Sequence, residues 1–203
     1  MTFSENSLGM RVFLDANIIA KPVTRTLLMV GGPVSGFEVC WSLFAEEEAA
    51  RHMRSQALPP DAIRERFGGD LTPRGTHADQ FTNTSPKDRQ ILADAVASHS
   101  SHLITEDVDD FSDGDLRSVN LTAVNPDVFL CHLMSEEGYF TVLKLLSHTQ
   151  HHPPRSPEEI HSALGRQHPL LTSRFSNYFE LRPQPPAQRP PRATVRGVNP
   201  LEF

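Results

Sequence analysis

The chain has 203 residues, of which 38% are hydrophobic, and its formal charge at pH 7 is −6. This length fits one domain with an appendage, and the acidic balance argues against a generic nucleic-acid coat protein. No stretch approaches the ~20 apolar residues of a membrane span, and the N-terminus lacks the basic and apolar regions of a signal peptide. Cys40 and Cys131 have no zinc-like or disulfide-like spacing, so we expect reduced thiols in a cytoplasmic protein.

Short apolar runs alternate with helical patterns through the first two thirds of the chain. Buried strands are predicted at residues 11–14, 37–41, 102–105 and 121–124. Helices are predicted at residues 18–30, 42–54, 59–67, from Ser85 to about 97, and from Pro126 to about 133, with a long loop over 68–85. Gly31-Gly32-Pro33 is expected to end the first helix. This alternation predicts an α/β fold of three layers, α/β/α, with a central parallel sheet.

The character of the sequence changes after about residue 134. A helical pattern over 136–148 and the helix start Ser156-Pro157-Glu158-Glu159 predict a helical C-terminal extension over 135–181. Residues 182–203 are rich in proline and arginine, carry a net charge of +3, and are expected to be extended or disordered. Their last apolar residues, Val195, Val198, Leu201 and Phe203, favour docking on the protein itself or on a second chain.

Four acidic residues follow strands or begin helices at one expected edge of the sheet. Asp15 ends the first strand, Asp107 follows the third, Glu48 lies in a helix, and Asp88 lies in a helix's first turn. Two carboxylates about 5 Å apart repel by about 3 kcal/mol at an effective dielectric constant of about 20. A hard divalent cation, Mg²⁺ or Mn²⁺, would relieve that repulsion. Taken singly, each acid has a plainer role, as a helix cap, a helix-dipole partner or a solvated side chain.

The order of these motifs resembles the PIN-domain family of metal-dependent ribonucleases, which includes VapC-type toxins. Residues 12–17 resemble its opening strand, 88–95 its third motif, and 103–111 its fourth, a strand ending in Thr and followed by acids. Glu48 stands six residues after Ser42, as in the second motif, and residues 125–130 resemble an ending common in one branch. The resemblance covers residues 10–134, which would form the nuclease domain.

The resemblance implies hydrolysis of RNA phosphodiester bonds, with Mg²⁺ or Mn²⁺ bound by Asp15, Glu48, Asp88 and Asp107. Asn17, Thr105 and Asp110 would orient these ligands. The residues expected to contact RNA phosphates are Arg51, Arg54, Lys87 and Arg89. Glu47 is the alternative to Glu48, because the helix holds consecutive glutamates. Family membership further implies an antitoxin partner, a homodimer and a cytoplasmic setting.

Two alternatives remain open from the sequence. The fold could serve as a binding module for RNA or protein that no longer cleaves, although the complete set of acids argues against this. The histidines could also bind zinc, because His148 and His152 are four residues apart and could share a helix face. His151, His161 and His168 lie near them in the sequence.

Overall fold

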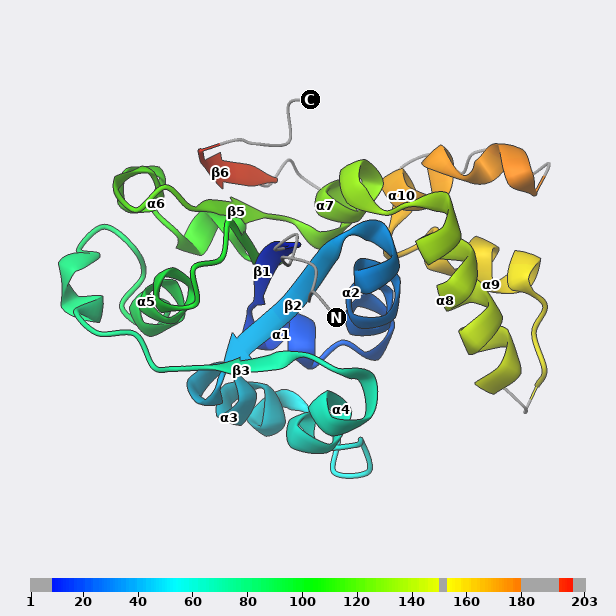
Figure 1. Cartoon of the computed structure of the whole chain (residues 1–203), viewed down its shortest axis with the longest axis horizontal. Helices are drawn as coiled ribbons and strands as arrows, with labels where there is room; N and C mark the ends of the chain where they lie inside the picture. Colours follow the sequence, from blue (N-terminus) through cyan, green and yellow to red (C-terminus); the bar gives the residue numbers. More distant parts are fainter. Residues whose placement is uncertain (1–8, 150–152, 180–193, 199–203) are drawn as a thin grey trace, which may run out of the picture.

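The protein is described by a computed structural model that covers residues 9–149, 153–179 and 194–198. The described residues form a six-stranded sheet in the order β3-β2-β1-β4-β5-β6 (Figure 1). The strands are β1 Met10–Leu14, β2 Phe37–Ser42, β3 Asp70–Thr72, β4 His102–Ile104, β5 Thr122–Val124 and β6 Val195–Gly197. Strands β1 to β5 pair in parallel, and β6 pairs antiparallel to β5.

Helices cover both faces of this sheet, so the predicted α/β class with a mainly parallel central sheet is confirmed. Figure 1 shows α2 on one side of the sheet and α5 on the other. The helices are α1 Ala16–Ile19, α2 Pro22–Ser35, α3 Leu43–His52, α4 Pro60–Phe67, α5 Arg89–Ala97, α6 Asp113–Ser118, α7 Pro126–Leu133, α8 Glu136–Thr149, α9 Pro157–Leu164 and α10 Pro169–Arg174. Short 3-10 helices lie at Ala78–Gln80, Val108–Asp110 and Ser176–Tyr178.

The central strands lie in the core because their side chains are apolar on both faces of the sheet. Val12, Phe13 and Leu14 of β1 are fully buried, as are Leu103 and Ile104 of β4. Continuous apolar runs of this kind are typical of parallel strands that helices cover on both sides. The carboxyl ends of β1 and β4 therefore meet at one edge of the sheet, where the chain first becomes polar.

The helix predicted for residues 18–30 differs from the observed structure. Two helices, α1 and α2, occupy the region, and α2 continues through Gly31-Gly32-Pro33 to Ser35. Gly36 ends it with a left-handed φ of 87°. Gly31 and Gly32 serve packing here, because a Cβ atom on either would lie 2.7 Å from Met134 or Phe37, respectively. The two glycines are therefore needed for the close packing of α2 against Met134 and Phe37, and they do not end the helix.

Two further predictions between residues 68 and 88 are wrong in detail. The expected loop contains β3, which pairs with β2 at the edge of the parallel strands, and a 3-10 helix. Ser85 does not cap the next helix, because α5 begins only at Arg89. The backbone N–H of Asp88 instead donates to the Ser85 carbonyl at 2.9 Å, which forms a turn before the helix. This turn places Asp88, rather than Ser85, at the N-cap position.

The C-terminal extension forms helices, as expected, and packs against the sheet domain. Tyr139 of α8 is fully buried, and its ring stacks on Phe175 with the centroids 4.4 Å apart. Asp127 of α7 accepts hydrogen bonds from the backbone N–H groups of Leu170 and Leu171, each at 3.0 Å. These bonds hold the start of α10 against α7, whereas the ring stacking holds α8 and the end of α10 together within the extension.

The described part of the proline- and arginine-rich tail docks on the sheet. Val195–Gly197 forms β6, and Arg196 pairs with Asp109 at 2.6 Å, beyond the carboxyl end of β4. The prediction that apolar residues of the tail dock is confirmed for Val195, while Leu201 and Phe203 lie outside the described residues.

The structure also describes the two cysteines and the length of the helices. Cys40 and Cys131 are both free thiols, Cys40 buried and Cys131 half-buried. Throughout the described ranges, every helix is too short or too polar to cross a lipid bilayer.

Candidate functional site

A cavity of about 450 Å³ opens at the carboxyl edge of the parallel strands. Its lining includes all four acids singled out from the sequence, Asp15, Glu48, Asp88 and Asp107. They come from the ends of β1 and β4, from α3, and from the turn before α5. The remaining lining residues are Ala16, Asn17, Ala20, Lys21, His52, Lys87 and Asp110. Segments far apart in the sequence thus bring their polar side chains to one cavity.

Asp15 is held in place by hydrogen bonds from three sides. Its Oδ1 accepts from the backbone N–H of Ala16 at 2.7 Å, and its Oδ2 accepts from Thr105 Oγ1 at 2.7 Å and Asn17 Nδ2 at 2.9 Å. Asp15 also caps α1, so the plainer role of a helix cap, considered from the sequence, is confirmed. Burial nevertheless raises the pKa of Asp15 to about 7, and repulsion from Asp88 and Glu48 adds to the effect.

Asn17 and Thr105 link Asp15 to Asp107. Asn17 Nδ2 lies 3.1 Å from Thr105 Oγ1 and 3.3 Å from Asp107 Oδ2. The backbone N–H of Asp107 donates to Thr105 Oγ1 at 3.1 Å. The pairing of β1 with β4 continues past the strands, because the N–H of Asp15 donates to the Ile104 carbonyl at 3.1 Å. The sheet therefore fixes the backbone beneath these two acids.

Asp88 has an unsatisfied oxygen within the cavity wall. Its Oδ2 is buried and makes no hydrogen bond among the described residues, and Lys87 Nζ lies 3.8 Å away. Burial raises the pKa of Asp88 to about 6, against the attraction of Lys87. Lys87 instead pairs more closely with Asp110 Oδ2, at 2.9 Å. A buried carboxylate oxygen without a donor is costly, so this atom fits a cation ligand better than a structural role.

The glutamates of α3 face three different surroundings. Glu48 lines the cavity, whereas Glu47 is exposed on another face of the helix. Glu46 is buried and accepts from Trp41 Nε1 at 2.8 Å and from Arg64 Nε at 3.3 Å, which is a structural role. The geometry therefore favours Glu48 over Glu47 for any chemistry in the cavity.

The donor set of the cavity fits Mg²⁺ or Mn²⁺ in its chemistry, because all the candidate ligands are carboxylate oxygens. Within the residues that the structure describes, no three acidic, histidine or cysteine side chains are grouped closely enough to hold one ion together. Binding an ion here would require rotation of side chains around the cavity. Asp88, whose Oδ2 makes no hydrogen bond among the described residues, has fewer bonds to break for this than Asp15.

The basic residues expected to contact RNA divide into two groups. Lys87 lines the cavity, but Arg89 donates to the carbonyls of Thr84 and Thr82 at 3.1 and 3.0 Å and so braces the preceding loop. Arg51 and Arg54 are exposed and are not part of the cavity lining.

Sequence reasoning missed two other basic residues of the cavity, Lys21 and His52. His52 lies four residues after Glu48, a spacing that puts both on one face of a helix and could have indicated it. Lys21 is exposed and pairs with Glu106. Nothing in its local sequence distinguishes it from a solvated lysine.

The histidines considered as zinc ligands are engaged elsewhere where the structure describes them. His148 is exposed, with Nδ1 2.7 Å from the Lys144 carbonyl. His161 and His168 are buried, 2.8 Å from the Tyr139 hydroxyl and 3.0 Å from Thr24 Oγ1. His151 and His152 lie outside the described residues.

Comparison with known proteins gives a distant likeness. A protein of Mycobacterium tuberculosis (strain ATCC 25618 / H37Rv), named "Putative ribonuclease VapC50", is 29% identical to this chain over 99 residues. The match covers 48% of this chain and 59% of that protein's length. No family model matches the chain, and no solved structure matches it. The likeness agrees with the resemblance to VapC-type ribonucleases seen in the motifs.

Proposed function

We propose that this protein is a metal-dependent endoribonuclease that hydrolyses RNA phosphodiester bonds. The observation that supports this most is the cavity lined by Asp15, Glu48, Asp88 and Asp107, in which Asp88 Oδ2 is buried and has no hydrogen bond from any described residue. Carboxylates drawn from four segments of the chain into one cavity repel each other unless a cation or a proton offsets their charge. Burial is the main reason that the pKa values of Asp15 and Asp88 are raised, and repulsion from the other acids adds to the rise.

In this proposal the four acids hold Mg²⁺ or Mn²⁺, which when bound lowers the pKa of a water and offsets charge on the attacked phosphate. Asp15 and Asp107 bind from positions fixed by the sheet, while Asn17 and Thr105 keep their carboxylates in orientation through the hydrogen bonds described above. Asp110 acts indirectly, because its bond to Lys87 holds that ammonium group beside the cavity.

Lys87, Lys21 and His52 are the residues of the cavity lining best placed to contact RNA phosphates. A lysine contributes a point charge to a phosphate without reading the base, so these contacts position the strand. Arg51 and Arg54 are exposed on or just after α3, and they would contact RNA only where it leaves the cavity. Arg89 braces the loop before α5 instead.

The likeness to a protein named as a VapC ribonuclease supports a role as the toxin of a toxin–antitoxin pair. The corresponding partners are an RNA substrate and an antitoxin protein, and we extend the proposal to a homodimer in the cytoplasm. An antitoxin has to block the cavity or displace the cation, so it should protect the carboxylates from solvent.

Incubation of purified protein with total cellular RNA tests the proposal. Cleavage is expected with Mg²⁺ or Mn²⁺, and its loss is expected in EDTA, with recovery when metal is added back. Asp88→Asn serves as the matched inactive variant. Cleavage that persists in EDTA, or that Asp88→Asn leaves unchanged, would contradict the metal-dependent mechanism. RNA binding without cleavage under all these conditions would instead support the non-cleaving binding module.

A further inference from the structure

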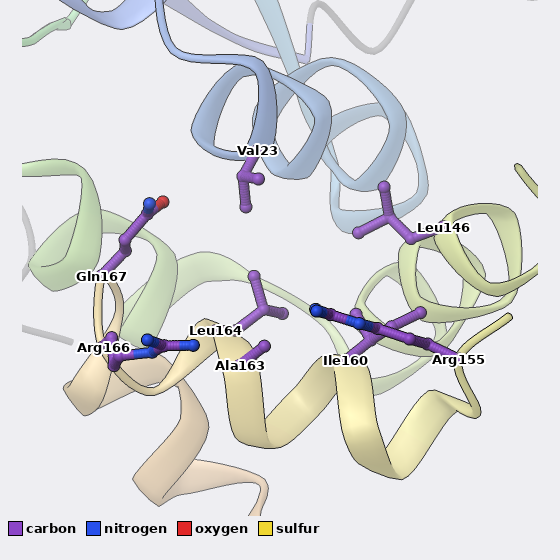
Figure 2. A pocket seen from close by; sticks show the side chains of 8 residues that line it. All are labelled: Val23, Leu146, Arg155, Ile160, Ala163, Leu164, Arg166 and Gln167. Carbon is purple, nitrogen blue, oxygen red and sulfur yellow. The ribbon is translucent and has the colours of Figure 1, made fainter. Parts of the chain in front are cut away.

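A second hollow lies between the C-terminal extension and the sheet domain. Its volume is about 320 Å³, and its apolar lining comes from α2, α8 and α9, through Val23, Leu146, Ile160 and Leu164 (Figure 2). Ile160 and Leu164 are almost fully buried, while Val23 and Leu146 are half-buried. The floor of the hollow is therefore a packed apolar surface that still contacts solvent.

Two arginines flank this floor at the two ends of α9. Figure 2 shows the side chains of Arg155 and Arg166 extending toward the middle of the hollow from opposite sides. Within the described ranges, neither guanidinium group takes part in a hydrogen bond or an ion pair. Glu159, an acid of the first turn of α9, is occupied in a capping box with Ser156, and its Oε2 accepts from the Ser156 N–H at 2.8 Å.

Two unpaired guanidinium groups that converge over an apolar floor fit a ligand with one anionic group and one apolar or flat group. Like charges that converge repel, and an anion between them removes that cost. Arginine matches phosphate in particular, because its planar fork donates two parallel hydrogen bonds. Its flat face also offers a stacking surface for a nucleobase, and aliphatic side chains can cover the other face of that base.

The position of the hollow connects it to the carboxylate cavity. Lys21 lines the cavity and Val23 lines the hollow, so both border the same three-residue stretch of backbone. Consecutive Cα atoms are about 3.8 Å apart, which places Lys21 and Val23 at most ~7.6 Å from each other. The cavity and the hollow therefore border neighbouring residues of the connection between α1 and α2.

We propose that the hollow is a nucleotide subsite for single-stranded RNA, with a phosphate between Arg155 and Arg166 and its base against the apolar floor. This inference rests on the proposed function for the identity of the ligand. It adds a role for the C-terminal extension, which would hold substrate at a distance from the cleaved bond. Binding there should strengthen substrate affinity without altering the chemistry at the carboxylates.

The test measures binding of a labelled single-stranded RNA of about ten nucleotides, a length that fits single-strand binding sites of about 4–16 nucleotides. Fluorescence anisotropy in EDTA separates binding from cleavage. Arg155→Gln and Arg166→Gln should each weaken binding, and the double variant should weaken it by about tenfold, the order expected when one base and one phosphate are no longer held. The dependence of log affinity on log salt should become shallower by about 0.7 for each phosphate that the variant no longer neutralises.

Two further variants control for fold and charge. Ala163→Phe fills the hollow without changing charge, and it should weaken the ten-nucleotide RNA as well. Arg117→Gln removes the same charge from α6, which Figure 1 places on the other side of the molecule, and should leave affinity unchanged.

The outcomes separate this inference from the proposed function. A wild-type protein that binds the RNA through the two arginines but never cleaves it would overturn the ribonuclease and keep the subsite. If the protein cleaves RNA and the arginine and Ala163→Phe variants bind as tightly as Arg117→Gln does, the subsite is wrong. Absence of RNA binding by the wild-type protein would also overturn the subsite, and the two arginines would then have to bind a different anionic ligand.

Discussion

The carboxylate cavity and the arginine hollow each gather like charges, but the fold holds the two sets in different ways. Asp15 and Asp107 follow directly from β1 and β4, and hydrogen bonds from Thr105 and Asn17 fix them. The two arginines of the hollow extend on long side chains from the ends of α9, with no partner among the described residues. Hydrogen-bonded positions such as those of Asp15 and Asp107 suit chemistry that depends on ligand geometry, whereas long arginine side chains suit the capture of a substrate that varies in sequence.

The largest expected effect is on cleavage, and it should arise in the carboxylate cavity alone. Asp15→Asn and Asp88→Asn should each reduce the rate of RNA cleavage by at least about 100-fold, because each removes a carboxylate proposed to hold the metal ion that offsets charge in the transition state. The double arginine variant of the hollow should change KM and leave kcat near the wild-type value. Steady-state kinetics on one RNA substrate compares all three. A similar loss of kcat in the arginine variant would erase the functional distinction between the two sites.

The next effect is on stability without metal, and it should depend on pH. Asp88 and Asp15 have pKa values raised to about 6 and about 7, so the folded protein holds protons that the unfolded chain releases. Stability should therefore fall as pH rises from about 4 to about 7, by at most about 4 kcal/mol for Asp15. Asp88→Asn should remove the part of this fall in stability that is due to Asp88. It should therefore raise Tm at pH 8 more than at pH 4.

The gain from Asp15→Asn should be smaller than its pKa suggests. An asparagine amide in place of Oδ2 would face Asn17 Nδ2 and Thr105 Oγ1, which both donate to that oxygen in the native protein. Thermal unfolding in EDTA at both pH values measures the two variants side by side. An equal or lower Tm for Asp88→Asn at pH 8 would show that the charge of Asp88 does not destabilise the protein without metal.

A smaller effect concerns the groups that orient Asp15 and Asp107. Thr105→Val keeps the shape of the side chain but removes the hydroxyl that donates to Asp15 and accepts from the Asp107 N–H. Loss of such an orienting group typically costs about 10–100-fold in metal affinity. Thr122→Val on the neighbouring strand is a matched control, because its Oγ1 is buried without a hydrogen bond. Manganese titration of both variants should separate them.

The smallest effect is expected at the edge of the sheet. Arg196 of β6 pairs with Asp109 and donates to the Phe111 carbonyl at 3.0 Å, in the segment after Asp107. Arg196→Gln should lower the free energy of unfolding by about 0.2–1 kcal/mol, the range for an ion pair whose side chains are both partly exposed. Denaturant unfolding measures this. An unchanged stability would mean that β6 contributes nothing beyond its backbone pairing.

The positions of the four acids could be predicted from the sequence more closely than the elements around them. Strand ends are strongly determined by the change from apolar to acidic residues, so Asp15 and Asp107 could be assigned to one edge of a parallel sheet. The edge strand β3 could not be predicted, because Asp70-Leu71-Thr72 is short and half polar. Gly31 and Gly32 looked like a helix end because their role depends on contacts with Met134 and Phe37, which are remote in sequence.

The hollow escaped sequence analysis for a related reason. Arg155 and Arg166 lie 11 residues apart, and their convergence depends on the packing of α9 against α2 and α8. Lys21 was likewise missed, since its place beside Asp15 follows from the α1–α2 connection. Residues whose place follows from the end of a strand can therefore be predicted from the sequence. Residues that meet through long side chains on packed helices can be found only in the structure.

The most direct measurement of the central claim is a calorimetric titration with Mn²⁺ of the wild-type protein, Glu48→Gln and Glu47→Gln. The two variants remove the same charge from adjacent residues of α3, but only Glu48 lines the cavity. The account predicts that the wild type binds Mn²⁺ more tightly at pH 8 than at pH 5, that Glu48→Gln binds it at least about tenfold more weakly, and that Glu47→Gln matches the wild type. Equal affinities for all three proteins, or no Mn²⁺ binding at all, would contradict a metal site in this cavity.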